Sequence, residues 1–403
     1  MVVAGRQAQP RNIVSIRRLS LVLEFDPPEK LLQGLFADAR NLTTLCVSGQ
    51  HITTLPQLPA HLQDLQLSDC KQLRSLHVSG CRNLRSLPEL PATLEELYCN
   101  GCTALTALPS SLGSTALREL NCSGCARLQQ LPALPESLKN LEAGDCTSLT
   151  QLPEMPAALR LLEVVGCCLL RNLPELGHTA LTYLDISRCP LLTEIPELPA
   201  ETLEYLRASS LPGVTRLPAL SHEYATEVYI DNSGITELPD PLPRFGDFQA
   251  SYTLIERLPA IPECKTLQLE GCRLLRQLPE QLPEELYSLE LSGCTSLQQL
   301  PAELPHDLLF LTLKGCTALQ RLPAQLPASL KVLDCEGCSS LQQLPAQLPA
   351  SLEHLHLEGC SSLQRLPDLS GLKLRELRVE GGMCHIVWGW GVGAGKNLVM
   401  YLK

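Results

Sequence analysis

Apolar and polar residues alternate in short segments that return at a nearly constant interval along this chain. A representative segment is residues 94–109, LEELYCNGCTALTALP. Within it, Leu97 and Cys99 occupy alternate positions with polar residues between them, which is the period-two pattern of a short strand with one buried face. Each repeat is therefore expected to contribute one short strand.

The pair Leu-Pro marks the same place in successive repeats, and from Leu87 onward it recurs every 20 to 23 residues, with Ile195 filling one slot. A leucine pattern with a period of about 20 to 29 residues indicates a leucine-rich repeat. The motif Leu-Pro-x-Leu-Pro follows each strand, and its prolines favour an extended, polyproline-like return segment. We therefore predict a curved leucine-rich-repeat solenoid of about fifteen to sixteen short turns. A parallel sheet is expected on its concave side and the return segments on its convex side.

The repeat pattern predicts three segments, namely an N-terminal cap (1–41), the solenoid (42–380) and a C-terminal cap or truncated tail (381–403). The cap contains a short amphipathic helix over residues 30–40, beginning after Pro28, and the first strand is expected near Leu42. Cys70 and Cys81 are only 11 residues apart. This short interval predicts a bent or merged turn.

The chain contains 19 cysteines, and most of them occupy one slot of the repeat, namely Cys70, Cys81, Cys102, Cys125, Cys146, Cys167, Cys189, Cys272, Cys294, Cys316, Cys338 and Cys360. Because a buried thiol behaves as a small apolar group, we interpret this series as corner filler in a reducing cytoplasm. Three CxxC pairs invite a zinc interpretation, namely Cys99/Cys102, Cys122/Cys125 and Cys335/Cys338. Structural zinc needs four converging ligands, so core packing is the favoured interpretation.

The net charge of −11 argues against nucleic acid and anionic membrane surfaces as partners, because phosphate binding needs a basic stripe. It favours a protein partner with a basic surface. No stretch approaches the roughly 20 apolar residues needed to cross a bilayer, and the N-terminus lacks a signal-peptide core. We expect a monomer without membrane insertion or a Sec-type signal, although a specialised secretion route stays open.

The sequence contains few motifs typical of catalytic or cofactor-binding sites, and we expect no enzyme activity, no catalytic residue and no cofactor. Residues 391–397, GVGAGKN, resemble a phosphate loop, but Trp390 and Asn397 stand where that motif needs glycine and Ser or Thr. Neither Gly-x-Ser-x-Gly nor His-Glu-x-x-His occurs.

A histidine pair on one predicted strand is the remaining candidate for chemistry. His354, His356 and Glu358 are expected on the exposed face, beside Asp334 and Glu336 of the preceding turn. Imidazole with carboxylate could hold a transition metal or serve in acid–base work. The alternative interpretation is a polar patch that contacts protein, and no metal ligand is assigned.

Where repeats supply a scaffold, function is expected at positions at which the repeats differ. On the exposed strand face, Glu142, Glu163 and Asp185 follow one another, and stacked carboxylates repel unless a basic group arrives. With tyrosines nearby, they form a candidate protein-binding face. The predicted partner-binding residues are Glu96, Tyr98, Glu119, Glu142, Glu163, Tyr183, Asp185, Tyr205, Arg207, Tyr229 and Asp231. The alternative is a solvated charged face without a partner.

The sequence motif of residues 87–97, LPELPATLEEL, resembles the short leucine-rich repeats of secreted bacterial effectors of the IpaH/YopM type. The resemblance extends over residues 42–380. The resemblance implies a protein that binds host proteins after delivery into a eukaryotic cytoplasm. Many members carry a downstream ubiquitin-ligase domain, but no room for one follows residue 380, and no cysteine matches its nucleophile. The corner at 293–297, GCTSL, differs from the usual asparagine corner and is similar to that of plant resistance-type repeats.

The favoured interpretation is a noncatalytic protein-interaction scaffold whose acidic concave face holds a basic protein, acting as a secreted bacterial effector on host proteins. An alternative is the substrate-recognition half of a bacterial E3 ubiquitin ligase whose catalytic domain is absent from this chain. A third is a small-ligand or metal receptor that uses His354 and His356.

Overall fold

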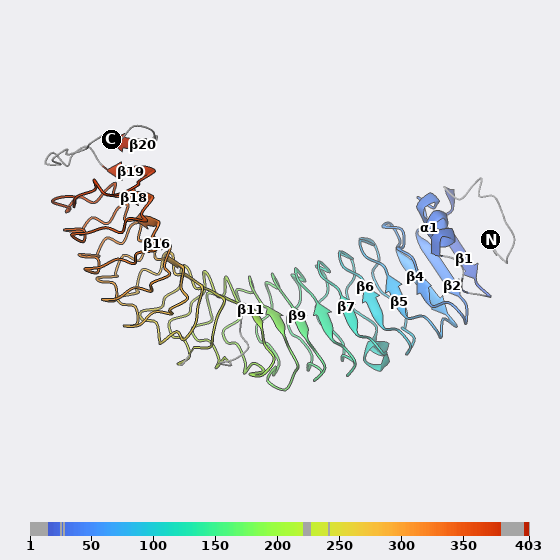
Figure 1. The fold of residues 1–403 in the computed structure, drawn as a ribbon. Coiled ribbons are helices and arrows are strands. Elements are labelled where there is room, and N and C mark those ends of the chain that lie inside the picture. Colours follow the sequence, from blue (N-terminus) through green and yellow to red (C-terminus); the bar gives the residue numbers. More distant parts are fainter. Residues whose placement is uncertain are drawn as a thin grey trace. The chain divides into compact units, whose positions relative to one another are not determined.

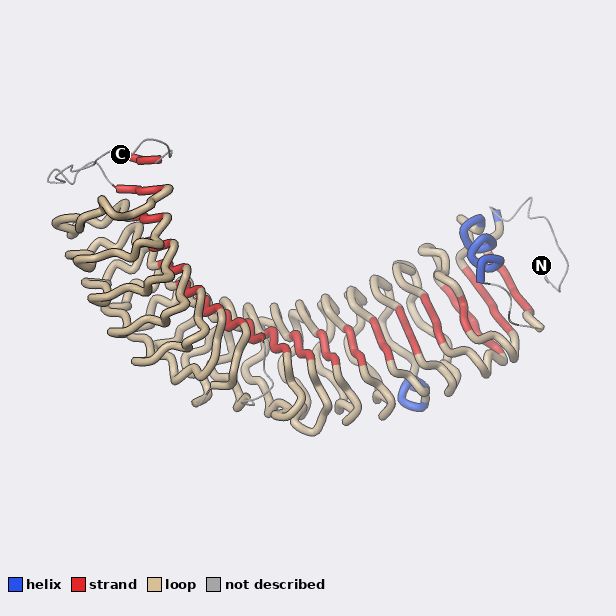
Figure 2. Tube along the Cα trace, viewed as in Figure 1, coloured by secondary structure: helices blue, strands red, loops and turns tan. Residues whose placement is uncertain are grey.

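The computed structural model describes residues 15–24, 26, 29–220, 227–240, 242–379 and 399–402. The chain divides into two compact units, unit 1 (Met1–Leu203) and unit 2 (Glu204–Lys403). In each unit short parallel strands stack repeat upon repeat (Figure 1). The strands of a unit lie along one side of its stack and the return segments along the other (Figure 2). The leucine-rich-repeat solenoid predicted from the leucine period is therefore confirmed. The phosphate-loop-like residues 391–397 lie outside the described residues.

Unit 1 begins with a strand that the repeat pattern did not reveal. β1 (Arg18–Val22) pairs in parallel with β2 (Thr44–Ser48). The predicted helix is confirmed as α1 (Glu29–Asp38), but it is β1 that covers the edge of the first repeat strand. Leu19 and Leu21 are both buried, so a period-two signal was present in RLSLV, although it is too short to stand out from the sequence alone.

The interval between Cys70 and Cys81 marks a change of sheet. β4 (Asp64–Ser68) pairs with β2, whereas β5 (Ser75–His77) pairs with β3 (Thr54–Leu55). Two strands with different partners thus follow each other within one short stretch of chain. This is the merged turn that the short cysteine spacing predicted.

Beyond β5 each turn contributes one strand. In unit 1 these are β6 (Glu96–Tyr98), β7 (Glu119–Asn121), β8 (Asn140–Glu142), β9 (Leu161–Glu163) and β10 (Tyr183–Asp185). In unit 2 they are β11 (Tyr205–Arg207), β12 (Glu227–Tyr229), β13 (Asp247–Gln249), β14 (Thr266–Gln268), β15 (Ser288–Glu290), β16 (Phe310–Thr312), β17 (Val332–Asp334), β18 (His354–His356), β19 (Glu376–Val379) and β20 (Val399–Leu402). Within these runs the strand pairs are parallel, and the middle residues of neighbouring strands lie opposite each other, as Leu289 does to Leu311.

The core consists of leucine layers that repeat from turn to turn. Leu97, Leu141 and Leu162 at the strand centres are fully buried, and burial of such side chains is the main source of stability in a stack whose turns cannot fold alone. The return segments are irregular and extended, as predicted. One exception is the 3₁₀ helix η2 (Ser110–Ser114), which lies in a repeat two residues longer than its neighbours.

The corner cysteines do more than fill space. The Cys316 thiol is fully buried and donates a hydrogen bond to the Leu291 carbonyl of the preceding turn, with a sulfur–oxygen distance of 3.1 Å. The same bond recurs at Cys102, Cys125, Cys146, Cys167, Cys189, Cys272, Cys294, Cys338 and Cys360. The Leu291 carbonyl also accepts the backbone N–H of Cys294 at 3.1 Å. The thiol ladder therefore supplies a second donor to such carbonyls, which have two lone pairs, and links each corner to the preceding turn.

Glycine precedes most corner cysteines because the backbone there turns into the left-handed region. Gly315 has a φ of 71° and Gly337 has a φ of 74°, which side chains with a Cβ adopt only at a cost. Built on Gly359, a Cβ would also approach the Gly337 Cα to 3.1 Å. The glycine-cysteine corner is therefore a packing motif, and both residues serve the stack.

The reactivity of the thiols in the native protein tests whether these cysteines are buried. Burial raises the pKa of the Cys294 and Cys316 thiols and raises that of Cys264 to about 12, so near pH 8 little of the reactive thiolate forms. Cys168 is exposed. We expect iodoacetamide to label Cys168 in the folded protein and the three buried thiols only after denaturation, measured by peptide mass spectrometry. Labelling of Cys294 at the rate of Cys168 would contradict the buried ladder.

Candidate functional site

The predicted partner-binding residues fall in both units, seven in unit 1 and four in unit 2. In unit 1, strand register brings the carboxylates together as expected. Glu142 lies opposite Glu163, and Glu163 lies opposite Asp185. We call these three residues the acidic strip. Neighbouring strands are about 4.8 Å apart, so the strip concentrates negative charge on one face.

The three carboxylates differ in their surroundings. Glu142 accepts a hydrogen bond from the Asn121 side-chain amide at 2.6 Å. Asp185 is only 8% exposed and accepts the Ser187 backbone N–H at 2.9 Å. The Glu163 carboxylate lies over Gly144 of the preceding turn, where a Cβ would come within 3.0 Å of it. Glu142 and Glu163 are thus the more accessible members, while Asp185 contributes charge from a buried position.

A hydrogen-bonded network flanks the acidic strip on its N-terminal side. The Tyr98 hydroxyl donates to the Glu119 carboxylate, and the Tyr98 ring stacks on His77 with centroids 4.7 Å apart. Ser75 donates to the Glu96 carboxylate at 2.9 Å. Burial, followed by the bond to Glu119, raises the pKa of Tyr98. The tyrosine is therefore a fixed hydroxyl donor within this face.

Two ion pairs lie near the strand ends of unit 1. Arg74 pairs with Glu95, and Arg188 pairs with Asp145, which belong to positions just before or after the strands. Tyr183 stands on β10 two residues before Asp185, at the first position of the same strand. The structure thus places the seven predicted residues of unit 1 on one strand face. Asn121, which the prediction did not include, lies among them as a partner of Glu142.

The predicted residues of unit 2 form a different kind of cluster. The Arg207 guanidinium lies 5.3 Å from the centroid of the Tyr229 ring, a cation–π geometry. The Tyr229 hydroxyl donates to Glu227 at 2.7 Å, and burial together with that carboxylate raises the pKa of Tyr229 to about 12. Asp231 accepts the Ser251 backbone N–H at 2.7 Å, and burial raises its pKa.

Further along unit 2, strands β18 and β19 assemble a histidine–carboxylate cluster. His354, His356 and Glu376 each offer one ligand atom, and these atoms lie within 4.8 Å of one another. The expected neighbour Asp334 is present, with its Oδ2 3.4 Å from His356 Nδ1. Glu358 is not part of the group, because Glu376 of the next turn lies opposite His354 in the strand register.

Glu336 is also outside this cluster, because it forms an ion pair with Lys314 at 2.9 Å. Glu376, which the prediction missed, could have been found from the sequence, because the 22-residue period of these repeats leads from His354 to position 376. Register, and not proximity along the chain, therefore determines which side chains meet on the strand face.

The CxxC pairs are integrated into the core. Both cysteines of each pair are fully buried, and the second donates to a carbonyl of the preceding turn, as Cys338 does to Leu313 at 3.1 Å. Among the described residues, no cysteine joins a group of three or more potential metal ligands. Burial and the hydrogen bonds place these cysteines in the packed core.

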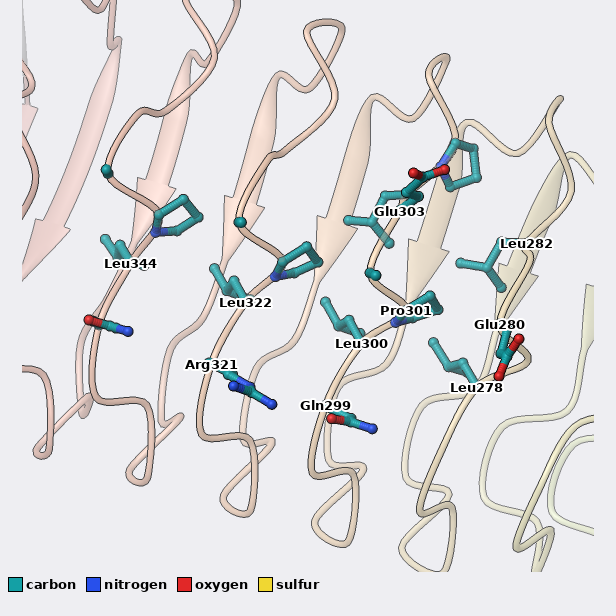
Figure 3. Close-up of a pocket in the computed structure, with 18 of the residues that line it drawn as sticks. Leu278, Glu280, Leu282, Gln299, Leu300, Pro301, Glu303, Arg321, Leu322 and Leu344 are labelled. Carbon is teal, nitrogen blue, oxygen red and sulfur yellow. The ribbon is translucent and has the colours of Figure 1, made fainter.

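A shallow groove of about 1650 Å³ runs along the return segments of unit 2. Figure 3 shows its equivalent leucines in a row on successive turns, namely Leu278, Leu300, Leu322 and Leu344. Leu300 and Leu322 are each only 7% exposed. The accessible surface of the groove is therefore largely that of prolines, alanines and polar side chains such as Gln299 and Arg321, which gives no specific indication of an occupant.

Comparisons with known proteins give the repeat class. Residues 180–201 match the Leucine Rich Repeat family, and no curated protein matches the chain. Among solved structures, YopM from Yersinia enterocolitica WA-314 is 26% identical, with 88% of this chain and 76% of that chain covered and a TM-score of 0.48. YopM from Yersinia pestis, a leucine-rich effector protein, is 25% identical, with 80% and 85% covered and a TM-score of 0.47.

A leucine-rich repeat protein from Bacteroides ovatus ATCC 8483 is also similar, at 15% identity, with 87% of this chain and 88% of that chain covered and a TM-score of 0.42. The family match and the stacked parallel strands identify a leucine-rich-repeat solenoid, as the leucine period predicted. None of the described helices has the length and apolar character needed to span a bilayer.

Proposed function

We propose that this chain is a noncatalytic scaffold that binds a basic protein surface through the acidic strip of unit 1. The observation that carries the proposal is the direct register of Glu142, Glu163 and Asp185 on three successive strands. Such a column of like charges is destabilising by itself. A partner that brings lysine or arginine side chains to it gains electrostatic attraction and relieves that repulsion.

The flanking residues support a protein partner over a free cation. Tyr98 and Tyr183 stand on the same face, and both are partly exposed. Tyrosine supplies large contact area with little loss of side-chain entropy and is enriched at interfaces. The Tyr98 ring is already held by His77 and by Glu119, so this part of the face is ordered before a partner arrives.

The effector role is the second part of the proposal. The Leu-Pro-x-Leu-Pro repeats resemble those of secreted bacterial effectors, and the similar YopM from Yersinia pestis is a leucine-rich effector protein. The cysteines of the described residues are free thiols, most of them buried, which suits a reducing cytoplasm. The chain would then act on a host protein within a eukaryotic cytoplasm.

Capture of a partner from eukaryotic cell lysate tests the proposal. The native chain is compared with a variant that carries Glu142→Lys, Glu163→Lys and Asp185→Lys. We expect the native chain to retain a protein that the variant does not, because the three lysines repel the basic partner that the three carboxylates attract. Circular dichroism and thermal melting verify that both proteins are folded.

A control variant for net charge changes three glutamates in the return segments of the same turns. Glu136, Glu154 and Glu175 are exposed there, and their replacement by lysine changes the net charge by the same amount. This control variant is expected to capture the partner as the native chain does. Equal capture by the strip variant, or equal loss in both variants, would refute binding at the acidic strip.

A further inference from the structure

We infer that His354, His356 and Glu376 form a binding site for a divalent transition-metal ion of the Zn²⁺ class. The site lies in unit 2 and does not depend on the acidic strip of unit 1. It combines two imidazole nitrogens with one carboxylate oxygen, a ligand set that suits zinc and related borderline metals.

The spacing of the three ligand atoms fits one ion. His354 Nδ1 lies 3.2 Å from Glu376 Oε2, and His356 Nε2 lies 3.5 Å from the same oxygen. Around tetrahedral zinc with bonds of about 2.0–2.1 Å, neighbouring ligand atoms are about 3.4 Å apart. The two histidines each offer a ring nitrogen within 4.8 Å of the other. A small side-chain adjustment therefore closes the set around a metal.

Contacts behind the ligands orient them in the way that metal sites require. His356 Nδ1 faces Asp334 Oδ2 at 3.4 Å, so a proton on Nδ1 directs the lone pair of Nε2 toward Glu376. A carboxylate behind a ligating histidine is the usual device for fixing its tautomer. Arg378 holds the other oxygen of Glu376, with an Nε–Oε1 distance of 2.7 Å. Glu376 is left with one oxygen to coordinate.

The His356 nitrogen that faces the site makes no hydrogen bond within the described part of the chain, although Glu376 Oε2 lies 3.5 Å from it. Nε2 is buried and has no hydrogen-bond partner among the described residues, and buried polar atoms without a partner are uncommon because they lose hydration. A bound metal would use this lone pair. The side chain of His354 is 34% exposed and that of His356 only 14%, so the set opens to the strand face on one side. Three protein ligands leave a position there for water or for a side chain of a partner.

Metal binding is tested on the chelator-treated full chain near pH 7.5, with Zn²⁺ as the probe. We expect titration calorimetry to show one zinc ion per chain and the melting temperature to rise by about 3 °C or more at saturating metal. His356→Gln and Glu376→Gln should each abolish both effects. His306→Gln is the matched control, because its exposed side chain pairs with Asp307 outside the cluster, and it should bind as the native chain does.

Two further measurements separate this site from the cysteines and from a simple ion-pair network. Co²⁺ should give an absorption spectrum without thiolate charge-transfer bands, although Cys335 and Cys338 follow β17, the strand next to His354 and His356. Asp334→Asn should retain the one-to-one stoichiometry and weaken the affinity by about 10- to 100-fold. The inference is overturned if Zn²⁺ produces no heat and no melting shift. It is equally overturned if binding survives in Glu376→Gln or shows thiolate bands.

Discussion

Leu311→Ala is expected to lower the free energy of unfolding of unit 2 by about 3 kcal/mol, since a fully buried leucine in a close-packed core leaves a cavity when shortened. Leu311 has no exposed surface and lies opposite Leu289 and Leu333 on the neighbouring strands. The cavity would weaken both interfaces of its turn, and nearest-neighbour interfaces supply the stability of a stack. Urea denaturation followed by circular dichroism measures the change.

Phe310→Ala supplies the matched control on the same strand. Its side chain is large and apolar but 40% exposed, so its removal is expected to cost about 1 kcal/mol or less. Equal losses of stability in the two variants would contradict a core organised in leucine layers behind the strand face.

The second large effect is expected on binding. Once a partner is captured, the triple lysine variant of the acidic strip should weaken its affinity by about 100-fold, if each lost carboxylate contributes about 1 kcal/mol. Glu142→Gln, Glu163→Gln and Asp185→Asn together should give a smaller loss and a weaker dependence on salt, because they remove charge without reversing it. Surface plasmon resonance at several salt concentrations measures both quantities.

The same series also distinguishes the members of the strip. Asp185 is buried and bound to the Ser187 backbone, so Asp185→Asn alone should affect affinity less than Glu142→Gln or Glu163→Gln. An affinity that is unchanged in the triple glutamine–asparagine variant would contradict a role for these charges.

The fold was predictable because one sequence pattern is repeated in nearly every turn. The leucine period and the Leu-Pro-x-Leu-Pro motif predict the strands, the extended return segments and the merged turn near Cys70, and each follows from local geometry. β1 was missed because one isolated strand has no repeat to reveal it. Its burial depends on β2, which lies about 26 residues further along the chain, as the pairing of Leu19 with Leu45 shows.

The candidate sites were predictable only in part. Strand alternation and period bring Glu142, Glu163 and Asp185 together, but the burial of Asp185 depends on side-chain packing that the pattern does not contain. In the histidine cluster, Glu358 was favoured because it is close in sequence, whereas Glu376 is close in space. The donor role of the corner thiols likewise depends on backbone carbonyls, and their positions follow only from the stacked turns.

Zero-length carbodiimide crosslinking, which joins a carboxylate directly to a lysine, tests the binding proposal most directly. The captured partner is crosslinked to the native chain, and the joined peptides are identified by mass spectrometry. The account predicts crosslinks from Glu142 or Glu163 to lysines of the partner. Crosslinks confined to the return-segment carboxylates Glu136, Glu154 and Glu175 would contradict it and place the partner on the opposite side of the repeats.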